Sequence, residues 1–325
     1  MDKERDFGLW VHVVLFLIAT SWGFNNIAMK IGFRYLTAPQ FSGIRLLIAL
    51  PFMLYFAFWM PGRIPFTKRD LLGVAGIGCL GLGIFNILFP IGIDQTSAPL
   101  GGILMATMPI HVVILSLAFK LERPDWKSIF GVLLTIVGLI VITFASHQPD
   151  STTQSTLKGI IFIVVAELGY AINTTFLRPY MKKYKPLQVT GLAMAVSVVI
   201  YQIFYFPQMR GLVLSEIEPV GWICVLYSGL IAFLFANILW NYAIKNIGST
   251  KVSVYGNLPP VIVIILSAII FKDVMYASQM LGAIIILMGV VLVQLRKTDS
   301  SDTMEEDNLP VEKQIGPLPF SDLTI

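Results

Sequence analysis

The chain has 325 residues, of which 56% are hydrophobic and only 13% are charged, and its mean hydropathy is +0.78. Soluble globular proteins carry about 25% charged residues because their surfaces face water, so this composition excludes an ordinary soluble protein. The formal net charge of +4 comes mainly from short segments between apolar runs, where basic residues orient membrane helices. We therefore expect the lipid bilayer as the main partner, and no nucleic acid.

Ten apolar stretches are long enough to cross a bilayer, since a spanning helix needs about 20 mostly apolar residues. They are Leu9–Ile31, Pro39–Met60, Leu71–Ile93, Pro99–Phe119, Ser128–Ser146, Leu157–Arg178, Leu187–Phe206, Gly221–Ile244, Thr250–Phe271 and Ala277–Leu295. After Leu295 the composition changes to acidic residues and proline. This change predicts a disordered acidic cytoplasmic tail over residues 298–325.

Lysine and arginine are distributed unequally between the two sides of these ten stretches. One side collects 17 of them: Lys3, Arg5, Arg63, Lys68, Arg69, Lys120, Arg123, Lys127, Arg178, Lys182, Lys183, Lys185, Lys245, Lys251, Arg296, Lys297 and Lys313. The other side has five: Lys30, Arg34, Lys158, Arg210 and Lys272. Because basic residues stay in the cytoplasm, both termini are predicted to be cytoplasmic, in a cell (inner) membrane protein.

The two halves of the chain resemble each other in sequence. At an offset of 151 residues the matching pairs are Gly78 with Gly229, Asn86 with Asn237, Pro109 with Pro260, Gly131 with Gly282 and Gly138 with Gly289. Nearer the start of each half the offset is slightly smaller, and Gln40 matches Gln188. Each half holds five stretches, an odd number, so the second copy enters the membrane upside down. The predicted fold is all-α, with ten transmembrane helices in two inverted five-helix repeats over residues 1–148 and 149–297.

The residues that carry this repeat also resemble a known family. The run Trp22–Lys30 followed by Arg45, the loop Leu121–Pro124, and the pair Lys272-Asp273 are similar to the EamA family of the drug/metabolite transporter superfamily. The resemblance covers about residues 10–295, and it departs at Asp273-Val274, where the family usually has Glu-Pro. It implies a ten-helix exporter or exchanger of small metabolites, often amino acids, with a central cavity.

Polar residues inside the apolar stretches are candidates for the wall of a substrate cavity, because unpaired polar groups are costly in hydrocarbon. The candidates are Trp22, Asn25, Asn26, Asn86, Tyr170, Asn237, Trp240 and Asn241. The first three share one helix face, as do the last three. Two interpretations stay open for this set: a cavity that hydrogen-bonds substrate, or polar contacts between packed helices.

Glu167 is the only carboxylate well inside a predicted span. An ionised carboxyl is costly at that depth, so Glu167 is a candidate for proton coupling. The alternative is a structural ion pair, for which Arg45 is the nearest chemical partner. His111 is a second proton-carrying candidate, although a lone membrane histidine is more often a hydrogen-bonded packing residue.

Other residues in the spans are assigned to the scaffold. Pro109 and Pro260 are expected inside helices, where each would free a backbone carbonyl and kink the helix or line a cavity. Arg45 is expected to hold carbonyls or a carboxylate near the outer face. The glycines at positions 131, 138, 282 and 289 form smooth stripes for close helix packing.

The leading function is secondary transport of a small metabolite such as an amino acid, by alternating access between the two halves. No Walker loop, H-E-x-x-H or G-x-S-x-G motif occurs, so we expect no enzyme activity, no cofactor and no metal. A proton or counter-substrate gradient would drive transport, and a homodimer stays open. The alternatives are a passive facilitator or channel, which needs no titratable residue, and a membrane-embedded enzyme, which needs carboxylates or histidines near the interface.

Overall fold

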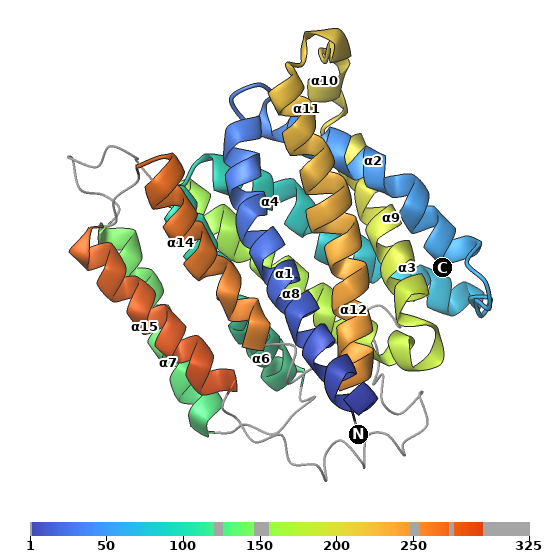
Figure 1. The fold of residues 1–325 in the computed structure, drawn as a ribbon, viewed down its shortest axis with the longest axis horizontal. Helices are drawn as coiled ribbons and strands as arrows, with labels where there is room; N and C mark the ends of the chain where they lie inside the picture. Colours follow the sequence, from blue (N-terminus) through green and yellow to red (C-terminus); the bar gives the residue numbers. More distant parts are fainter. Residues whose placement is uncertain (1, 120–125, 146–155, 248–253, 273–275, 295–325) are drawn as a thin grey trace.

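The computed structural model describes residues 2–119, 126–145, 156–247, 254–272 and 276–294 (Figure 1). Its elements are α1 (Asp2–Gly32), α2 (Ala38–Phe58), α3 (Lys68–Gly78), η1 (Cys79–Gly83), α4 (Ile84–Asp94), α5 (Ala98–Met105), α6 (Met108–Ala118), α7 (Trp126–Ala145), α8 (Leu157–Lys183), α9 (Pro186–Phe204), α10 (Phe206–Arg210), η2 (Leu214–Glu216), α11 (Pro219–Leu226), η3 (Tyr227–Phe235), α12 (Ala236–Ile247), η4 (Val254–Asn257), α14 (Leu258–Ile270) and α15 (Ala277–Gln294). The predicted loop Leu121–Pro124, the pair Asp273-Val274 and the acidic tail lie outside these residues.

Within the described ranges, every predicted apolar stretch is helical, and the prediction of an all-α membrane protein is confirmed. Seven helices are long and apolar enough to cross a membrane, and three shorter apolar helices cover Ile129–Val141, Leu258–Ile270 and Ala277–Leu292. Many large apolar side chains on these helices face outward, including Leu133, Ile203 and Ile269, which are 54%, 68% and 69% exposed. Such an exterior suits lipid rather than water.

Several of these helices begin at residues whose side chains cap the first turn. The Thr37 side chain accepts a hydrogen bond from the Gln40 backbone N–H, and the Gln40 side-chain oxygen accepts one from the Thr37 backbone N–H, which forms a capping box at the start of α2. Thr67 and Thr156 cap α3 and α8 in the same way through their hydroxyl oxygens. These caps satisfy backbone donors that the first turn of a helix leaves unpaired.

Pro109 and Pro260 are in helices, as expected, but they lie near helix starts rather than in helix interiors. Pro109 lies in the first turn of α6, after a break between α5 and α6, and Pro260 lies in the first turn of α14, directly after η4. Proline is tolerated there because the first-turn N–H groups have no partner within the helix. Helix interiors contain proline instead at Pro51, Pro90 and Pro179.

Helices from the two halves of the sequence pack against each other. The most extensive contacts join α7 with α15, α4 with α8, α2 with α9 and α1 with α14. Figure 1 shows α7 and α15 side by side at one end of the molecule, with α1, α12 and α14 nearer its middle. Two helical segments have π-type hydrogen bonding: η1 between α3 and α4, and η3 between α11 and α12.

Close packing between α7 and α15 depends on glycine. A Cβ atom at Gly138 would lie 2.9 Å from the Gly282 carbonyl oxygen, and one at Gly289 would lie 2.6 Å from the Gly131 carbonyl oxygen. Carbon atoms do not approach backbone oxygen this closely, so a larger residue at either position would push the two helices apart.

Glutamines tie the loops at the two ends of α2 to the opposite half. Near the end of α2, the Gln188 amide donates to the Ile64 carbonyl at 2.6 Å and accepts from the Ile64 N–H at 3.2 Å. Near the start of α2, the Gln40 amide donates to the Gln208 carbonyl at 3.3 Å. The 21-residue helix between these contacts spans about 30 Å at 1.5 Å per residue, so the two ties lie at opposite ends of the bundle.

Candidate functional site

Trp22 and Trp240 form an aromatic contact between α1 and α12. Their ring centroids are 4.8 Å apart with an interplanar angle of 49°, and the Trp22 indole N–H donates to the Ala232 carbonyl in η3 at 2.9 Å. That carbonyl lies in a π-helical segment, where the backbone pattern is locally altered. The structure therefore places both tryptophans in a helix–helix contact that joins the two halves.

Three asparagines of the candidate set are incompletely paired. Asn26, which is 1% exposed, donates to the Met105 sulfur at 3.1 Å, and Asn86, which is 0% exposed, donates to the Ser197 hydroxyl at 3.1 Å. Asn25 contacts the Met29 sulfur at 3.7 Å through its amide nitrogen. The side-chain oxygen of each asparagine is buried and has no hydrogen-bond partner among the described residues. Leaving a buried acceptor unsatisfied costs about 1–3 kcal/mol, so these oxygens are candidates for water or a ligand.

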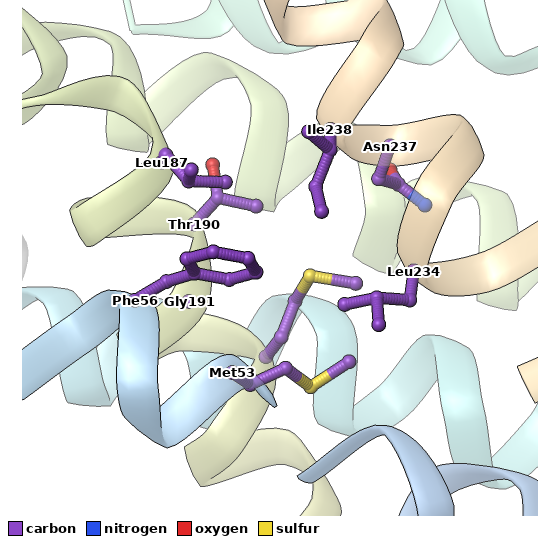
Figure 2. A pocket seen from close by; sticks show the side chains of 9 residues that line it. Met53, Phe56, Leu187, Thr190, Gly191, Leu234, Asn237 and Ile238 are labelled. Carbon is purple, nitrogen blue, oxygen red and sulfur yellow. The ribbon is translucent and has the colours of Figure 1, made fainter. Parts of the chain in front are cut away.

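Asn237 lies beside a small hollow between α2, α9 and the η3–α12 region (Figure 2). The hollow contains about 240 Å³ of atom-free space, part of which is open to the outside. It is lined by Met53, Phe56, Leu187, Thr190, Gly191, Met194, Leu234, Asn237 and Ile238. Figure 2 shows Thr190 and Asn237 on opposite sides of it. Among the cavity candidates whose side chains the structure describes, Asn237 alone lines this hollow.

Asn241 lies on α12, but its side chain is outside the described part of the structure. Tyr170 packs its ring against Phe85 of α4 with centroids 5.1 Å apart.

Glu167 is 3% exposed on α8 and has no hydrogen-bond or ion-pair partner in the described ranges. Arg45 does not pair with it, so the ion-pair alternative is not what the structure contains. Tyr170, one turn further along α8, lies within electrostatic range of the Glu167 carboxyl. A buried carboxyl without a cation is far less costly when it holds a proton, which keeps Glu167 a candidate for proton binding.

Arg45 is buried, with 3% of its surface exposed, and contacts both halves of the chain. Its Nη1 donates to the Ser228 hydroxyl of η3 at 3.0 Å and contacts the Met29 sulfur of α1 at 3.9 Å. The guanidinium lies 5.9 Å from the Phe233 ring centroid. The expectation that Arg45 holds carbonyls or a carboxylate is therefore wrong for the described residues, since its hydrogen-bonding partner is a hydroxyl.

His111 lies on α6 with 9% of its surface exposed, and its Nδ1 is 3.0 Å from the Thr107 carbonyl oxygen. This local contact one turn earlier fixes the ring without joining another helix. It matches the packing role that the sequence left open.

Sequence reasoning missed a cluster at the end where α8 meets the start of α3. The Lys183 ammonium forms a salt bridge with the Asp70 carboxylate, and the Tyr184 hydroxyl donates to the same carboxylate at 2.6 Å. We call Asp70, Lys183 and Tyr184 the charged clasp. Its only sequence signal is an acidic residue among the basic residues of that side, Arg63, Lys68 and Arg69.

The fold and its interior define a polytopic helical membrane protein that buries polar and ionisable groups between its helices. The chain belongs to the EamA-like transporter family, whose family model matches residues 9–144 and 157–295. The resemblance seen in the sequence is thereby confirmed.

Two relatives of the chain are named as transporters. An "Uncharacterized transporter" of Archaeoglobus fulgidus is 24% identical over 281 residues, covering 86% of this chain and 97% of that protein. A "Probable terminal-alkyne amino-acid exporter" of Streptantibioticus cattleyicolor is 24% identical over 284 residues, covering 87% of this chain and 92% of that protein. A solved crystal structure of 14% identity superposes with a TM-score of 0.59 over 88% of this chain and 97% of that chain, which shows a common fold.

Proposed function

We propose that the protein is a secondary transporter of a small metabolite such as an amino acid, an exporter or exchanger that works by alternating access between two inverted five-helix halves. The observation that carries this proposal is a set of contacts that repeats when the two halves are exchanged. Inverted repeats give a transporter two equivalent arrangements, one open to each side. The two segments matched by the family model, 9–144 and 157–295, support the same division.

The contacts between α7 and α15 repeat residue by residue when the two halves of the sequence are exchanged. Gly138 approaches Gly282 and Ile286. Its repeat partner, Gly289, approaches Gly131 and Thr135. Gly131 is the repeat partner of Gly282, and Thr135 is the repeat partner of Ile286. Each contact therefore has a counterpart at the offset of 151 residues. This reciprocity supports a pseudo-twofold axis that relates α7 to α15.

A second reciprocal contact links the π-helical regions to α2 and α9. A Cβ atom at Gly78 would lie 2.6 Å from the Ala193 carbonyl oxygen, and one at Gly229 would lie 2.7 Å from the Arg45 carbonyl oxygen. Gly78 matches Gly229, and Ala193 matches Arg45 at the same shift that pairs Gln40 with Gln188. The segment equivalent to η1 (Cys79–Gly83) is 230–234, which lies within η3. Each half thus has a π-helical segment at the same place, a feature often found at functional sites.

Contacts at the two ends of the bundle support such a mechanism. Gln188 and Gln40 occupy equivalent positions and tie opposite ends. The end tied by Gln188 also has the charged clasp and is predicted to be cytoplasmic. We infer that this end is the more strongly closed in the conformation described here, and that transport requires the clasp to open.

The site residues fit this mechanism in different roles. We assign Asn25, Asn26 and Asn86 to substrate contacts, because their buried oxygens lack partners. Glu167 is assigned to proton coupling, because no described cation neutralises it. The name of the Streptantibioticus relative, an amino-acid exporter, supports an amino acid as the substrate class.

Counterflow in proteoliposomes tests the proposal. Vesicles are loaded with a mixture of unlabelled L-amino acids and diluted into one labelled amino acid at a time. A secondary transporter gives transient accumulation of label above its equilibrium level. Simple equilibration of label without this overshoot would mean a facilitator or channel, and chemical conversion of the label would mean an enzyme.

The closed-clasp state provides the matched control for this measurement. In a background without Cys79 and Cys224, cysteines at positions 70 and 183 can be cross-linked across the clasp. Cross-linking should abolish counterflow, and reduction should restore it. Full counterflow by cross-linked protein would show that this end does not open during transport.

A further inference from the structure

Two basic segments lie side by side at the end of the bundle that has the charged clasp. One is residues 61–70, which precede and begin α3, and the other is residues 178–188, where α8 ends and α9 begins. Four contacts join them: Lys185 with the Pro61 carbonyl at 3.0 Å, Gln188 with Ile64, Tyr184 with the Thr67 N–H, and Lys183 with Asp70. We call the surface that these two segments form the basic surface.

Positive charge dominates the basic surface. Its two segments contain one acidic residue, Asp70, and seven basic residues: Arg63, Lys68, Arg69, Arg178, Lys182, Lys183 and Lys185. Six of the seven are exposed, and Lys185 is partly buried. The clasp shows how this surface receives a carboxylate, since Asp70 is held by the Lys183 ammonium and the Tyr184 hydroxyl. One carboxylate leaves the surface with a large excess of positive charge, which attracts an acidic partner.

The tail over residues 298–325 has the opposite composition. It contains one basic residue, Lys313, and seven acidic residues: Asp299, Asp302, Glu305, Glu306, Asp307, Glu312 and Asp322. The excess charge of the tail is therefore equal in size and opposite in sign to that of the basic surface. Acidic C-terminal tails of this kind often act as interaction segments.

The tail follows α15, whose last residue is Gln294. Gly138 of α7 approaches Gly282, near the start of α15, whereas Gly289, near the end of α15, approaches Gly131 of α7. The two helices are therefore antiparallel, and α15 ends beside the start of α7.

The start of α7 lies at the same end of the bundle as the basic surface. Phe119, directly after α6, packs against Phe176 of α8 with ring centroids 5.0 Å apart, and Phe176 is two turns before Lys183. Only seven residues separate Phe119 from Trp126, where α7 begins, too few to cross a hydrocarbon core of about 30 Å. The tail and the basic surface therefore start from the same end.

The acidic run Glu305–Asp307 is close enough along the chain to reach the basic surface. Glu305 is eleven residues beyond Gln294, and an extended chain of that length reaches up to about 36 Å. Helix α15 contacts α6, α6 contacts α8, and α8 contacts α3. Axes of contacting helices are about 8–10 Å apart, so these three steps cover about 30 Å at most.

We propose that the acidic tail, residues 298–325, docks on the basic surface of the same chain and covers the charged clasp. Exposed ion pairs are individually weak, so docking depends on many charges together and on the covalent attachment that keeps the tail at a high local concentration. A tail seated across both basic segments holds them together, and it therefore keeps this end of the bundle closed. The closing role rests on the proposed transport function, whereas the docking does not.

Disulfide cross-linking in full-length protein tests the docking. In the background without Cys79 and Cys224, one cysteine replaces Met304, beside the acidic run, and another replaces Pro65, an exposed residue of the basic surface. The two cysteines should form a disulfide within one chain. Salt of about 1 M, which shortens the screening length to about 3 Å, should slow its formation about tenfold.

Variants of this cysteine pair show whether charge causes the proximity. Neutralising the acidic run by Glu305→Gln, Glu306→Gln and Asp307→Asn should slow the disulfide as strongly as salt does. The matched control, Ser300→Ala, Ser301→Ala and Thr303→Ala, should leave its rate unchanged. Lys68→Glu with Arg69→Glu should also slow it, and adding Glu305→Lys with Glu306→Lys should restore it. A rate that does not respond to the charges of the tail would overturn the proposal.

Anionic lipid is the competing partner for the same surface, because membranes attract basic segments beside the spans. The cross-linking is therefore repeated in phosphatidylcholine vesicles with and without phosphatidylglycerol. Cross-linking that persists with phosphatidylglycerol sustains the tail as the occupant. Its loss there would assign the surface to lipid, and a product of dimer mass would assign the tail to a second copy, so either result overturns the proposal.

Counterflow tests the closing role separately. The protein with the neutralised acidic run should show counterflow several-fold faster than wild type, because the clasp can open more readily, and the serine and threonine control should match wild type. Charge-dependent cross-linking with unchanged counterflow would overturn the closing role and leave the docking in place. If no solute shows counterflow, the transport function fails, and the cross-linking result still decides the docking.

Discussion

Lys183 at the end of α8 forms a salt bridge with Asp70 in the first turn of α3. Tyr184 donates to the same carboxylate, and its oxygen accepts from the Thr67 N–H at 3.2 Å. The clasp therefore links the segment before α3 to the junction of α8 and α9. At the opposite end of α2 the Gln40 contact, which corresponds to the Gln188 contact at this end, is uncharged. The two ends of the molecule differ in the number and the charge of their closing contacts.

Asp70→Asn should weaken the clasp without unfolding the protein. The Asp70 and Lys183 side chains are 13% and 42% exposed, so solvent screening limits the loss to about 1 kcal/mol or less. We expect this end to open more often, so that a cysteine at Thr190, beside the hollow, reacts several-fold faster with a small polar thiol reagent. Lys68→Gln, an exposed change on the same turn, is the control. Unchanged reactivity in Asp70→Asn would mean that the clasp does not keep this end closed.

Gly289→Ala should separate α7 from α15. A Cβ atom at this position would lie within contact distance of the Thr135 side chain and 2.6 Å from the Gly131 carbonyl oxygen, and backbone cannot move aside cheaply. Overpacking of this kind costs about 1–3 kcal/mol, which thermal unfolding in detergent would measure. Gly76→Ala is the matched control, because nothing lies within 4 Å of a Cβ atom there and alanine favours helix by up to about 1 kcal/mol. Equal stability of the two variants would contradict the close approach.

Glu167→Gln should separate uphill transport from exchange. The amide has the shape and neutrality of a protonated carboxyl, and Glu167 has no described cation partner to lose, so the variant should fold normally. If Glu167 carries the driving proton, pH-driven accumulation should fall at least tenfold while counterflow remains near the wild-type rate. Glu218→Gln, at an exposed carboxylate, should change neither activity. Normal pH-driven accumulation by Glu167→Gln would remove Glu167 from the coupling mechanism.

A reporter fused after Leu295 should read as cytoplasmic. The expectation follows from the excess of basic residues on one side of the spans, and an even number of spans would place the N-terminus on the same side. Reporters placed after Arg34 and after Arg210 should read as extracytoplasmic, and one after Arg63 as cytoplasmic. A C-terminal reporter that reads as extracytoplasmic would require a different orientation or a different number of spans.

The depth of an ionisable residue in the membrane was the part of the candidate site that could be predicted from the sequence, because this depth depends on the position of the residue along one helix. The apolar run around Glu167 was enough to predict its burial, and the spacing of Trp22, Asn25 and Asn26 was enough to place them on one face. Their partners could not be predicted. Trp22 bonds a residue 210 positions away and Arg45 one 183 positions away, and such separations depend on how helices are arranged.

The sequence by itself determined the helical membrane class, the ten apolar stretches, the internal repeat and the family. Hydropathy and residue matching are properties of short segments, and they do not depend on how those segments pack. Only the tertiary structure decided that Arg45 contacts Ser228 rather than Glu167, that Asn237 lies beside the hollow between α2 and α9, and that a break between α5 and α6 precedes Pro109. These outcomes depend on interhelical distances of a few ångströms. Helix crossing angles and close glycine contacts determine those distances, and the hydropathy of a single segment does not reveal them.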